Sequence, residues 1–510
     1  MDVFTAMADI NSTSENPAPP DTVAALLEAD VNGPAVVSVD GDVVDHATLH
    51  HVVAHLASQL RGAGLGPKDR IAIVLPNGPE MAFVLLAAMS VGCAAPLNPK
   101  YREDEFRFYL DDLHAAALIT LEGASPEARA AAPNGTIFIG ARGEGALIDL
   151  VAPSTAKSTT DRPTADDLAL VLHTSGTTSR PKIVPLRQRN LARSARNIAA
   201  GLQLTSKDRS LNVMPLFHIH GMMAGLLAPL SVSGSVVCAP GFDAFQFHRW
   251  VAELTPTYYS AVPTMHQMVL ARAPAPGPSS LRFVRSSSAS LPEPVSEGLR
   301  TLFGVPVVEA YGMTEASHQM TSNPLPPAFT KPRSVGVSTG IDVAILDAQN
   351  NVLATGERGE VSIRGATVVD GYENNPAANE SAFTAGWFRT GDEGVLDEDG
   401  FLFLTGRLKE QINRGGEKIS PLEVDEVLLR HPAVAEAVTF AIPHEKLGEE
   451  VGAAVVLAEG HEATERELRT YLAEHLAAFK VPRRIVFVAE IPKGATGKIQ
   501  RIGLAEKLDL

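Results

Sequence analysis

Cysteine is scarce in this chain of 510 residues, and so are long apolar runs. The two cysteines, Cys93 and Cys238, lie far apart in apolar surroundings, which predicts neither a disulfide framework nor a thiolate metal site. The longest apolar run, residues 81–97, is interrupted by a serine, a glycine and a proline and is too short to cross a membrane. We therefore expect a reducing, cytoplasmic location and no membrane partner.

Positive charge is also in deficit. With 43 Lys and Arg against 59 Asp and Glu, the net charge of -16 argues against a nucleic-acid partner. Residues 1–20 are polar and contain proline, without the apolar core of a secretory signal, so we expect a flexible tail there. The length and a hydrophobic content of 45% predict a folded protein of two or more domains. No heptad pattern indicates an oligomeric state.

Strand and helix patterns alternate along much of the chain, which predicts an α/β fold with a large N-terminal domain of doubly wound sheets. In such sheets, ligands bind at the carboxyl ends of the strands. The predicted strands are 70–75, 93–97, one that ends at 213–214, 235–238 and 257–261, and the predicted helices are 80–89, 221–230 and 245–253.

Two changes in pattern follow. Residues 335–403 consist of short β-type runs cut by Gly and Asn, which predicts a small antiparallel β subdomain. The last hundred residues are more charged and contain a helix start, with Ser420 as N-cap, Pro421 at the first position and Glu423 completing a capping box. The helix is expected to stop at 431–432, between β-type runs at 434–440 and 452–457. We place the boundary near 407–410, so that 408–510 forms a smaller, mobile α+β domain after the large domain at 21–407.

The most informative segment is residues 173–182, which read HTSGTTSRPK. Its hydroxyl groups, its glycine and Lys182 are the groups that bind phosphate oxygens, and they predict a triphosphate site. A Walker-type loop is excluded, because Pro181 precedes the lysine and no Ser or Thr follows it. A polar surface turn is the alternative.

Further segments complete a set in which each motif alone is weak. They read PLFHIHG (215–221), EAYGMTEASH (309–318), WFRTGDEG (387–394), GRLKEQINRGGEKISP (406–421) and KGATGKIQR (493–501). Together with HTSGTTSRPK they resemble the ordered motifs of the acyl-adenylate-forming (AMP-binding) enzymes, which include acyl-CoA synthetases, adenylation domains of peptide synthetases and luciferases. The resemblance extends from about residue 35 to residue 501, and it implies an AMP-binding adenylation domain at 21–407 and a C-terminal lid domain at 408–510. It also implies ATP, Mg²⁺ and coenzyme A as partners.

The resemblance implies a nucleotide site. The hydroxyl loop and Lys182 would hold the β- and γ-phosphates, Tyr311 would offer adenine a stacking face, and Thr314 would contact the α-phosphate. Asp392 and Arg407 would bind the ribose hydroxyls. Taken alone, Tyr311 also fits a buried core tyrosine and Asp392 a turn residue. The implied ATP- and AMP-binding residues are Thr174, Ser175, Gly176, Thr177, Thr178, Lys182, Ser288, Ala289, Ser290, Glu309, Ala310, Tyr311, Gly312, Thr314, Asp392, Arg407 and Lys498.

The implied catalytic residues are Lys498, Thr314, Glu315 and His220. Lys498 lies between glycines in a loop that would deliver its ammonium to the carboxylate and α-phosphate oxygens, and Glu315 would ligate Mg²⁺. Taken alone, a C-terminal lysine is usually a solubilising charge and a lone glutamate a surface charge. The adjacent motif residues give both the functional interpretation.

The resemblance further implies a rotation of the C-terminal domain between two half-reactions, with Lys409 as the hinge. Adenylation would use Lys498, and thioester formation would bring a glycine-rich segment to the coenzyme A tunnel. The implied tunnel residues are His218, Gly415, Gly416, Glu417 and Lys418.

The implied acid pocket is polar. It draws on segments near 215–221, 260–265 and 285–291 and on the residues after YGMTE, which supply His218, His220, Ser286, Ser287, Ser288, Ser290, Ser317 and His318. Of these, His220, Ser287, Ser288 and His318 are the acid-binding candidates. A fatty-acid tunnel would be apolar, so this lining suits a short acid with a second carboxylate. The combination of HTSGTTSRPK with YGMTEASHQM resembles the oxalate–CoA ligases of plants and fungi, which commonly carry a peroxisomal ending that this chain lacks. We therefore expect oxalate as the acid and oxalyl-CoA as the product.

Alternatives stay open at this point. The serines fit a strand end, His220 fits a core histidine, and the H-x-H pair 218–220 lacks a third zinc ligand. The enzyme also fits a medium-chain or aromatic acyl-CoA synthetase, or one that loads a carrier-protein thiol. A nucleotide-binding sensor without catalysis is disfavoured because the charged motif residues are all present.

Overall fold

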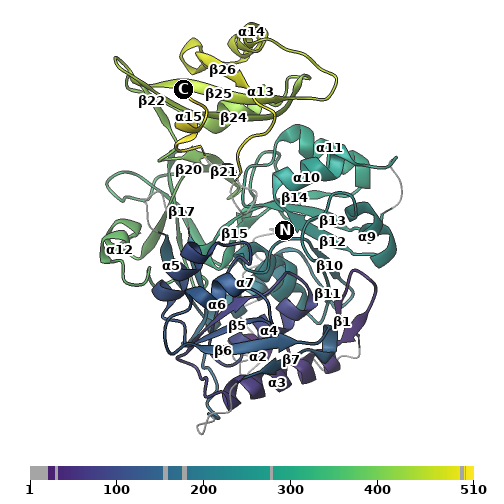
Figure 1. Ribbon diagram of the computed structural model, residues 1–510. Helices are drawn as coiled ribbons and strands as arrows, with labels where there is room; N and C mark the ends of the chain where they lie inside the picture. The colour runs from purple at the N-terminus through teal and green to yellow at the C-terminus, as the bar shows by residue number, and fades with distance from the viewer. Residues whose placement is uncertain are drawn as a thin grey trace, which may run out of the picture.

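The computed structural model describes residues 21–28, 33–152, 159–174, 181–275, 279–493, 499 and 501–510. Two mostly parallel sheets form the large N-terminal part, and a smaller domain stands above them (Figure 1). The predicted tail at 1–20 lies outside the described residues. In the part of the chain that is described, no helix combines the length and the apolar composition needed to cross a bilayer.

The N-terminal sheet contains the predicted strand–helix–strand unit, with β3 parallel to β4 and α4 (Pro79–Met89) between them. Every residue of α4 from Met81 to Met89 is buried, as the continuous apolar run predicted. The sheet order is β7 (Asp149–Val151), β6 (Ile137–Arg142), β5 (Ala117–Leu121), β3 (Arg70–Val74), β4 (Cys93–Pro96), β8 (Leu168–Thr174) and β9 (Lys182–Arg187).

The central sheet carries the second series of predicted strands. Six neighbouring strands in the middle of this sheet are parallel, namely β1, β11, β10, β12, β13 and β14. Strands β2, β15 and β16 add antiparallel edges. The sheet order is β16 (Val337–Ser338), β15 (His318–Ser322), β14 (Val307–Met313), β13 (Phe283–Ser287), β12 (Tyr258–Ala261), β10 (Arg209–Asn212), β11 (Ser235–Cys238), β1 (Pro34–Val37) and β2 (Val43–Asp45).

Helices cover both faces of both sheets, which confirms the doubly wound prediction. Ile71 and Ile73 of β3 face a core shared between the two sheets, whereas Ala72 and Val74 face the outer helices α5 and α6. Leu211 of β10 packs with α9, α10 and α11 on the outer side of the central sheet. The helices are α2 (Val23–Leu26), α3 (His46–Gly62), α5 (Glu103–Leu113), α6 (Pro126–Ala131), α7 (Gln188–Gly201), α8 (Ala228–Leu230), α9 (Phe247–Leu254), α10 (Pro263–Ala271) and α11 (Glu293–Phe303).

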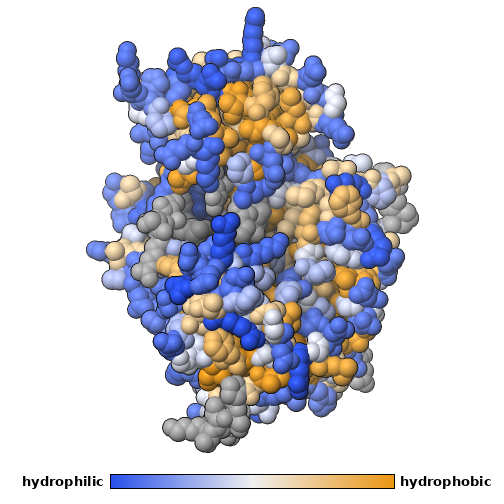
Figure 2. All heavy atoms as spheres, viewed as in Figure 1, coloured by the Kyte–Doolittle hydropathy of each residue, from blue (hydrophilic) through white to orange (hydrophobic). Residues whose placement is uncertain are grey.

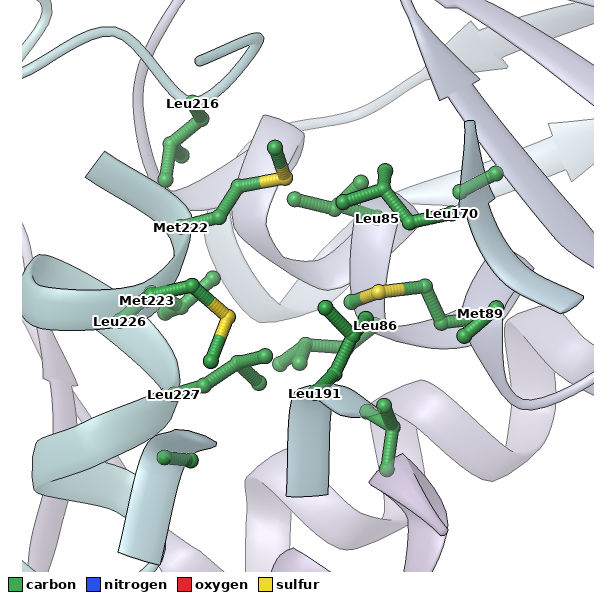
Figure 3. Packing of buried hydrophobic residues seen from close by; sticks show 14 of the residues in the cluster. Leu85, Leu86, Met89, Leu170, Leu191, Leu216, Met222, Met223, Leu226 and Leu227 are labelled. Atoms are coloured by element: carbon green, nitrogen blue, oxygen red, sulfur yellow. The ribbon is translucent and has the colours of Figure 1, made fainter. Parts of the chain in front are cut away.

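Between the sheets, α4 and α7 pack against the π-helix η3 (Gly221–Leu227). Figure 3 shows leucine and methionine side chains from these helices meeting in one apolar layer. The predicted helix 221–230 is therefore present, but its first turns have π geometry, which is common near functional sites. The turn that enters it is tight: a Cβ on Gly221 would lie 2.3 Å from the carbonyl oxygen of Pro215.

The β subdomain consists of antiparallel strands, as predicted, and also contains a helix that the pattern did not indicate. Residues 335–341 do not belong to its sheet, because β16 pairs with β15 of the central sheet. The strands are β17 (Asp342–Leu346), β18 (Arg358–Arg364), β19 (Phe383–Thr384), β20 (Trp387–Leu396) and β21 (Leu402–Arg407), and the helix is α12 (Pro376–Ala382).

The C-terminal domain is α+β, as predicted, with a mixed sheet under helices. Helix α13 (Pro421–Leu428) begins after Ser420, but the predicted capping box is wrong. The hydroxyl of Ser420 instead donates to the carbonyl of Thr405 at 2.6 Å, which ties the helix start to β21. The other elements are β22 (Ile412–Arg414), β23 (Glu417–Ile419), β24 (Val434–His444), β25 (Gly448–Leu457), α14 (Glu465–His475), β26 (Arg484–Phe487) and α15 (Leu504–Lys507). The face seen in Figure 2 is mostly hydrophilic, with an apolar patch over this domain.

Because the turn before η3 has no room for a side chain, Gly221→Ala is expected to lower the stability of the large domain by about 1–3 kcal/mol, the usual effect of overpacking. Gly62→Ala is the matched control, since a Cβ there meets nothing within 4 Å at the end of α3, and we expect a neutral or slightly stabilising effect. The thermal unfolding midpoint should fall in Gly221→Ala and should stay unchanged or rise slightly in Gly62→Ala. Equal midpoints would contradict the packing argument.

Candidate active site

Several predicted site residues lie at the carboxyl ends of the parallel strands of the central sheet. Ser286 pairs with Glu309 and Ser287 with Ala310, so the segments after β13 and β14 leave the sheet side by side. The backbone N–H of Leu291 binds the carboxyl of Glu309, and burial raises the pKa of that carboxyl to about 8. The predicted nucleotide residues at 288–290 and 309–312 are thus neighbours.

Tyr311, Asp392 and Arg407 form a joint between the central sheet and the β subdomain. The Tyr311 hydroxyl on β14 donates to Asp392 Oδ2 on β20, and Arg407 Nε on β21 donates to Asp392 Oδ1 at 2.8 Å. Asp392 is buried, and its charge raises the pKa of Arg407. Burial, together with Asp392, raises the pKa of Tyr311 well above its usual value. The three predicted residues therefore meet at one place.

Gly312 sets the shape of the turn that follows Tyr311. A Cβ at this position would lie 1.8 Å from the carbonyl oxygen of His318, so only glycine lets β14 and β15 approach here. The register of the two strands shifts between Tyr311 and Gly312. The resulting turn carries Thr314 and Glu315 away from the sheet.

Glu315 is the buried carboxylate of this turn and meets Lys182 across Tyr372. The Tyr372 hydroxyl donates to Glu315 Oε1 at 2.8 Å, and Lys182 Nζ lies 4.3 Å from the centre of the Tyr372 ring. Burial lowers the pKa of Lys182, and the charge of Glu315 opposes that shift. A carboxylate held beside a lysine that is predicted to bind phosphate fits Mg²⁺, which takes few protein carboxylates and completes its shell with phosphate and water.

The structure describes only the two ends of the predicted hydroxyl loop. Thr174, at the end of β8, pairs with Lys182, at the start of β9, and Ser175, Gly176, Thr177 and Thr178 lie outside the described residues. His173 at the loop entrance makes a 3.0 Å contact with Asp112.

Lys498 also lies outside the described residues. Its segment is framed by a β-bridge between Lys493 and Ile499. Just beyond it, Arg501 forms ion pairs with Asp425 at 2.6 Å and with Glu410 at 3.3 Å. The base of the predicted catalytic loop is thus anchored next to the predicted hinge.

The acid candidates His220 and His318 lie together in a buried polar cluster. Their rings stack with centroids 4.8 Å apart and planes inclined by 23°. His220 Nε2 lies 2.7 Å from Ser260 Oγ, and His220 Nδ1 lies 3.1 Å from Ser288 Oγ. Backbone strain marks the same place, because Ser288 and His318 have φ values of +75° and +94°.

Arg285 was not among the individually predicted site residues, although the predicted acid pocket included the segment 285–291. Its side chain has no exposed surface and lies at the centre of the cluster. The signal that could have revealed it is an arginine in a buried, otherwise uncharged strand (FVRSS). We call His220, Ser260, Arg285, Ser288 and His318 the acid-site cluster.

The serines of the predicted acid pocket separate in the structure. Ser287 lies on the same face of β13 as Arg285, and its buried Oγ has no hydrogen-bond partner among the described residues. Ser286 alternates to the other face, and the Ser317 hydroxyl donates to the carbonyl of Thr367 at 2.7 Å. Ala289 and Ser290 are exposed. Of these serines, Ser287 and Ser288 therefore accompany the two histidines.

The predicted coenzyme A residues are not brought together. Gly415 and Gly416 form the turn between β22 and β23, with φ values of +60° and +99° that suit glycine. Their backbone N–H groups donate to Leu447 O and Asn413 Oδ1, within the C-terminal domain. The hairpin lies at the edge of the sheet of the C-terminal domain, whereas β10, after which His218 follows, belongs to the central sheet of the large domain (Figure 1). Lys409 is exposed in the turn between β21 and β22.

Comparisons with known proteins cover nearly the whole chain. Oxalate–CoA ligases are 45% identical in Arabidopsis thaliana (94% of this chain, 97% of that one) and 43% identical in Saccharomyces cerevisiae (92% and 94%). Sulfoacetate–CoA ligase of Cupriavidus necator is 35% identical (95% and 97%). The ATP-bound structure of MatB from Rhodopseudomonas palustris has a TM-score of 0.85 at 27% identity (96% and 99%), whereas the apo structure of that protein scores 0.76. The fold of this chain is therefore closer to the ATP-bound form.

Two family models match the two parts of the fold. The model of the AMP-binding enzyme covers residues 26–373, and that of the AMP-binding enzyme C-terminal domain covers 423–498. The first match extends from α2, across both large sheets, to the Glu315–Tyr372 contact. The chain belongs to the AMP-binding enzyme family.

Proposed function

We propose that the protein is an ATP-dependent acid–CoA ligase whose acid is oxalate. A carboxylate oxygen of the acid attacks the α-phosphorus of ATP, and pyrophosphate leaves. The sulfur of coenzyme A then attacks the acyl carbon, its proton is lost, and AMP leaves. Membership of the AMP-binding family and the extent of the similarity to oxalate–CoA ligases support this assignment.

The observation that carries the choice of acid is the chemistry of the acid-site cluster. Arg285 places a positive charge among imidazole and hydroxyl groups, where a fatty acid would need aliphatic side chains. Oxalate has two carboxylates joined directly, so activation of one leaves the other within a bond of the reaction centre. A compact, cationic and fully polar site suits that second charge.

In the adenylation step, the residues of the joint and of the turn after β14 have distinct tasks. Asp392 would accept the ribose hydroxyls while it stays bound to Tyr311 and Arg407. Lys182 would bind the phosphate tail, and Lys498 would bind the oxygens of the reacting centre. Glu315 would hold Mg²⁺, which supplies positive charge to the phosphate oxygens when bound.

Thioester formation would follow a rotation of the C-terminal domain about Lys409, with the domain boundary near 407–410. The greater similarity to an ATP-bound structure and the outward position of the 415–416 hairpin both suit the adenylation stage. Rotation would exchange Lys498 for that hairpin at the site, as a lid does.

A short sulfonated acid is the second candidate. Sulfoacetate carries a carboxylate and a second anionic group, and a ligase for it is 35% identical to this chain. The acid-site cluster would accept such a dianion by the same contacts. A further alternative is that the thiol belongs to a carrier protein and not to free coenzyme A. Thioester formation with free coenzyme A alone would distinguish the coenzyme A ligase from an enzyme that loads a carrier protein.

Pyrophosphate release measured with oxalate, malonate, sulfoacetate, acetate, butyrate and octanoate tests the acid assignment. We expect oxalate to give the highest kcat/KM, because the polar cluster compensates its second charge. Coenzyme A-dependent formation of the thioester by mass spectrometry completes the assay. Preference for octanoate would refute the oxalate assignment, and preference for sulfoacetate would favour the second candidate.

Asp392→Asn is expected to weaken AMP binding roughly 10- to 100-fold, because a charged acceptor for the ribose hydroxyls is lost. Isothermal titration with AMP measures this directly. Asp399→Asn is the matched control, since that carboxylate is 63% exposed and binds Lys331 far from the joint. Affinities within twofold of each other in the two variants would contradict the role of Asp392.

Lys498→Ala is expected to slow adenylation by roughly 10²-fold or more, the effect of removing a key electrostatic contact. Thioester formation from supplied acyl-adenylate should stay near the wild-type rate. Lys507→Ala removes a similar but exposed charge from α15 and should change neither step. An equal loss in both half-reactions would argue against the division of labour between them.

A further inference from the structure

Arg285 is the largest side chain with no contact to solvent, and it forms no ion pair with any described residue. A guanidinium is expensive to bury without an anion, so its neighbours must compensate by hydrogen bonds. Burial lowers its pKa only to about 10, which leaves it charged at neutral pH. The cluster therefore contains a permanent positive charge for which the described protein provides no negative partner.

The hydrogen bonds of Arg285 fix the protons of its neighbours, because a guanidinium only donates. Its two terminal nitrogens face the Nε2 atoms of His220 at 3.4 Å and of His318 at 3.2 Å. Each Nε2 must then be an acceptor, and each ring carries its proton on Nδ1. Gln319 Oε1, at 2.9 Å, and Ser260 Oγ, at 2.9 Å, accept from the same two nitrogens and hold the fork in place.

Ser260 strengthens the same assignment at His220. Its oxygen accepts from Arg285, so its own hydroxyl proton is free to be donated to His220 Nε2 at 2.7 Å. Protonation of the stacked imidazoles would place like charges 4.8 Å apart beside a guanidinium. Neutral rings avoid this repulsion, and the Nδ1–H of His220 would then be directed to Ser288 Oγ at 3.1 Å.

We propose that Arg285 is a positioning residue for acid specificity, which holds His220 and His318 as neutral Nδ1–H tautomers, so that His220 donates to Ser288 Oγ and the hydroxyl proton of Ser288 is directed to the second carboxylate of a short diacid. This inference rests on the proposed function for its ligand. The guanidinium supplies the charge, and Ser287, on the same face of β13 as Arg285, adds a further buried hydroxyl. A monocarboxylate with an alkyl group would leave the Ser288 hydroxyl without an acceptor, which is how a hydrogen-bonding site rejects the wrong substrate.

The tautomers are tested in the wild-type protein with ¹⁵N-labelled histidine. Long-range ¹H–¹⁵N correlation at neutral pH should show His220 and His318 as neutral rings with the proton on Nδ1, assigned through His220→Gln and His318→Gln. Because this measurement needs no change at Arg285, it does not depend on whether such a variant folds. An Nε2–H tautomer or a protonated ring at both positions would overturn the proposal.

The specificity role is tested with Arg285→Gln and Arg285→Lys. In Arg285→Gln we expect the KM for oxalate to rise roughly 10- to 100-fold, the factor for a lost hydrogen bond to a charged group, while kcat/KM for acetate and the KM for ATP change little. The tautomer signals should change in the same variant. Arg282→Gln is the control, because Arg282 lies just before β13, is half-exposed and binds Asp208. This variant should leave the KM for oxalate and the histidine tautomer signals unchanged.

Arg285→Lys separates charge from positioning, because an ammonium on a flexible stem cannot hold both rings as the planar fork does. In Arg285→Lys we expect the KM for oxalate to be higher than in the wild type, as in Arg285→Gln. A wild-type KM together with altered histidine tautomers would overturn the positioning role. The proposed function fails on its own if the wild type activates no short diacid although both rings are Nδ1–H. The inference fails on its own if oxalate is activated with the rings in other states.

Discussion

The buried carboxylate of Asp392 is the interaction on which the arrangement of the site depends. It accepts hydrogen bonds from Tyr311 of the central sheet and from Arg407 at the end of the β subdomain. One anion thereby links two sheets, close to the point where the chain passes into the C-terminal domain. Because Arg407 is followed at once by the turn with Lys409, the proposed ribose site and the proposed hinge share a single anchor.

The charged residues near Asp392 fall into two groups with different proposed roles. Lys182 and Glu315 face each other across Tyr372 on the side of the proposed phosphate site, whereas Arg285 lies among imidazole, hydroxyl and amide groups on the side of the proposed acid site. In the proposed function, both half-reactions would collect negative charge between these two places. Fixed groups whose hydrogen bonds are already made can stabilise such charge without reorganising, which is the usual source of enzymatic rate enhancement.

Much of this could be predicted from the sequence, and the gaps have physical reasons. The strand at 70–75, the buried helix after it and the antiparallel subdomain followed from periodicity, because each depends on local pattern. The capping box failed because the Ser420 hydroxyl finds a partner on β21, a tertiary contact that no local rule contains. Arg285 was missed for a similar reason: only the meeting of three strands and η3 gives it its neighbours. The hydroxyl loop and Lys498 remain predictions.

The hairpin that joins β22 and β23 has a consequence for the motion of the smaller domain. Its two glycines sit in left-handed conformations that the turn requires, and Asn413 and Leu447 already bind their N–H groups. The segment is thus preorganised before it reaches any thiol. In the proposed rotation, moving this hairpin to the site would cost no loop-ordering entropy, and the conformational change would fall on a few backbone torsions around Lys409.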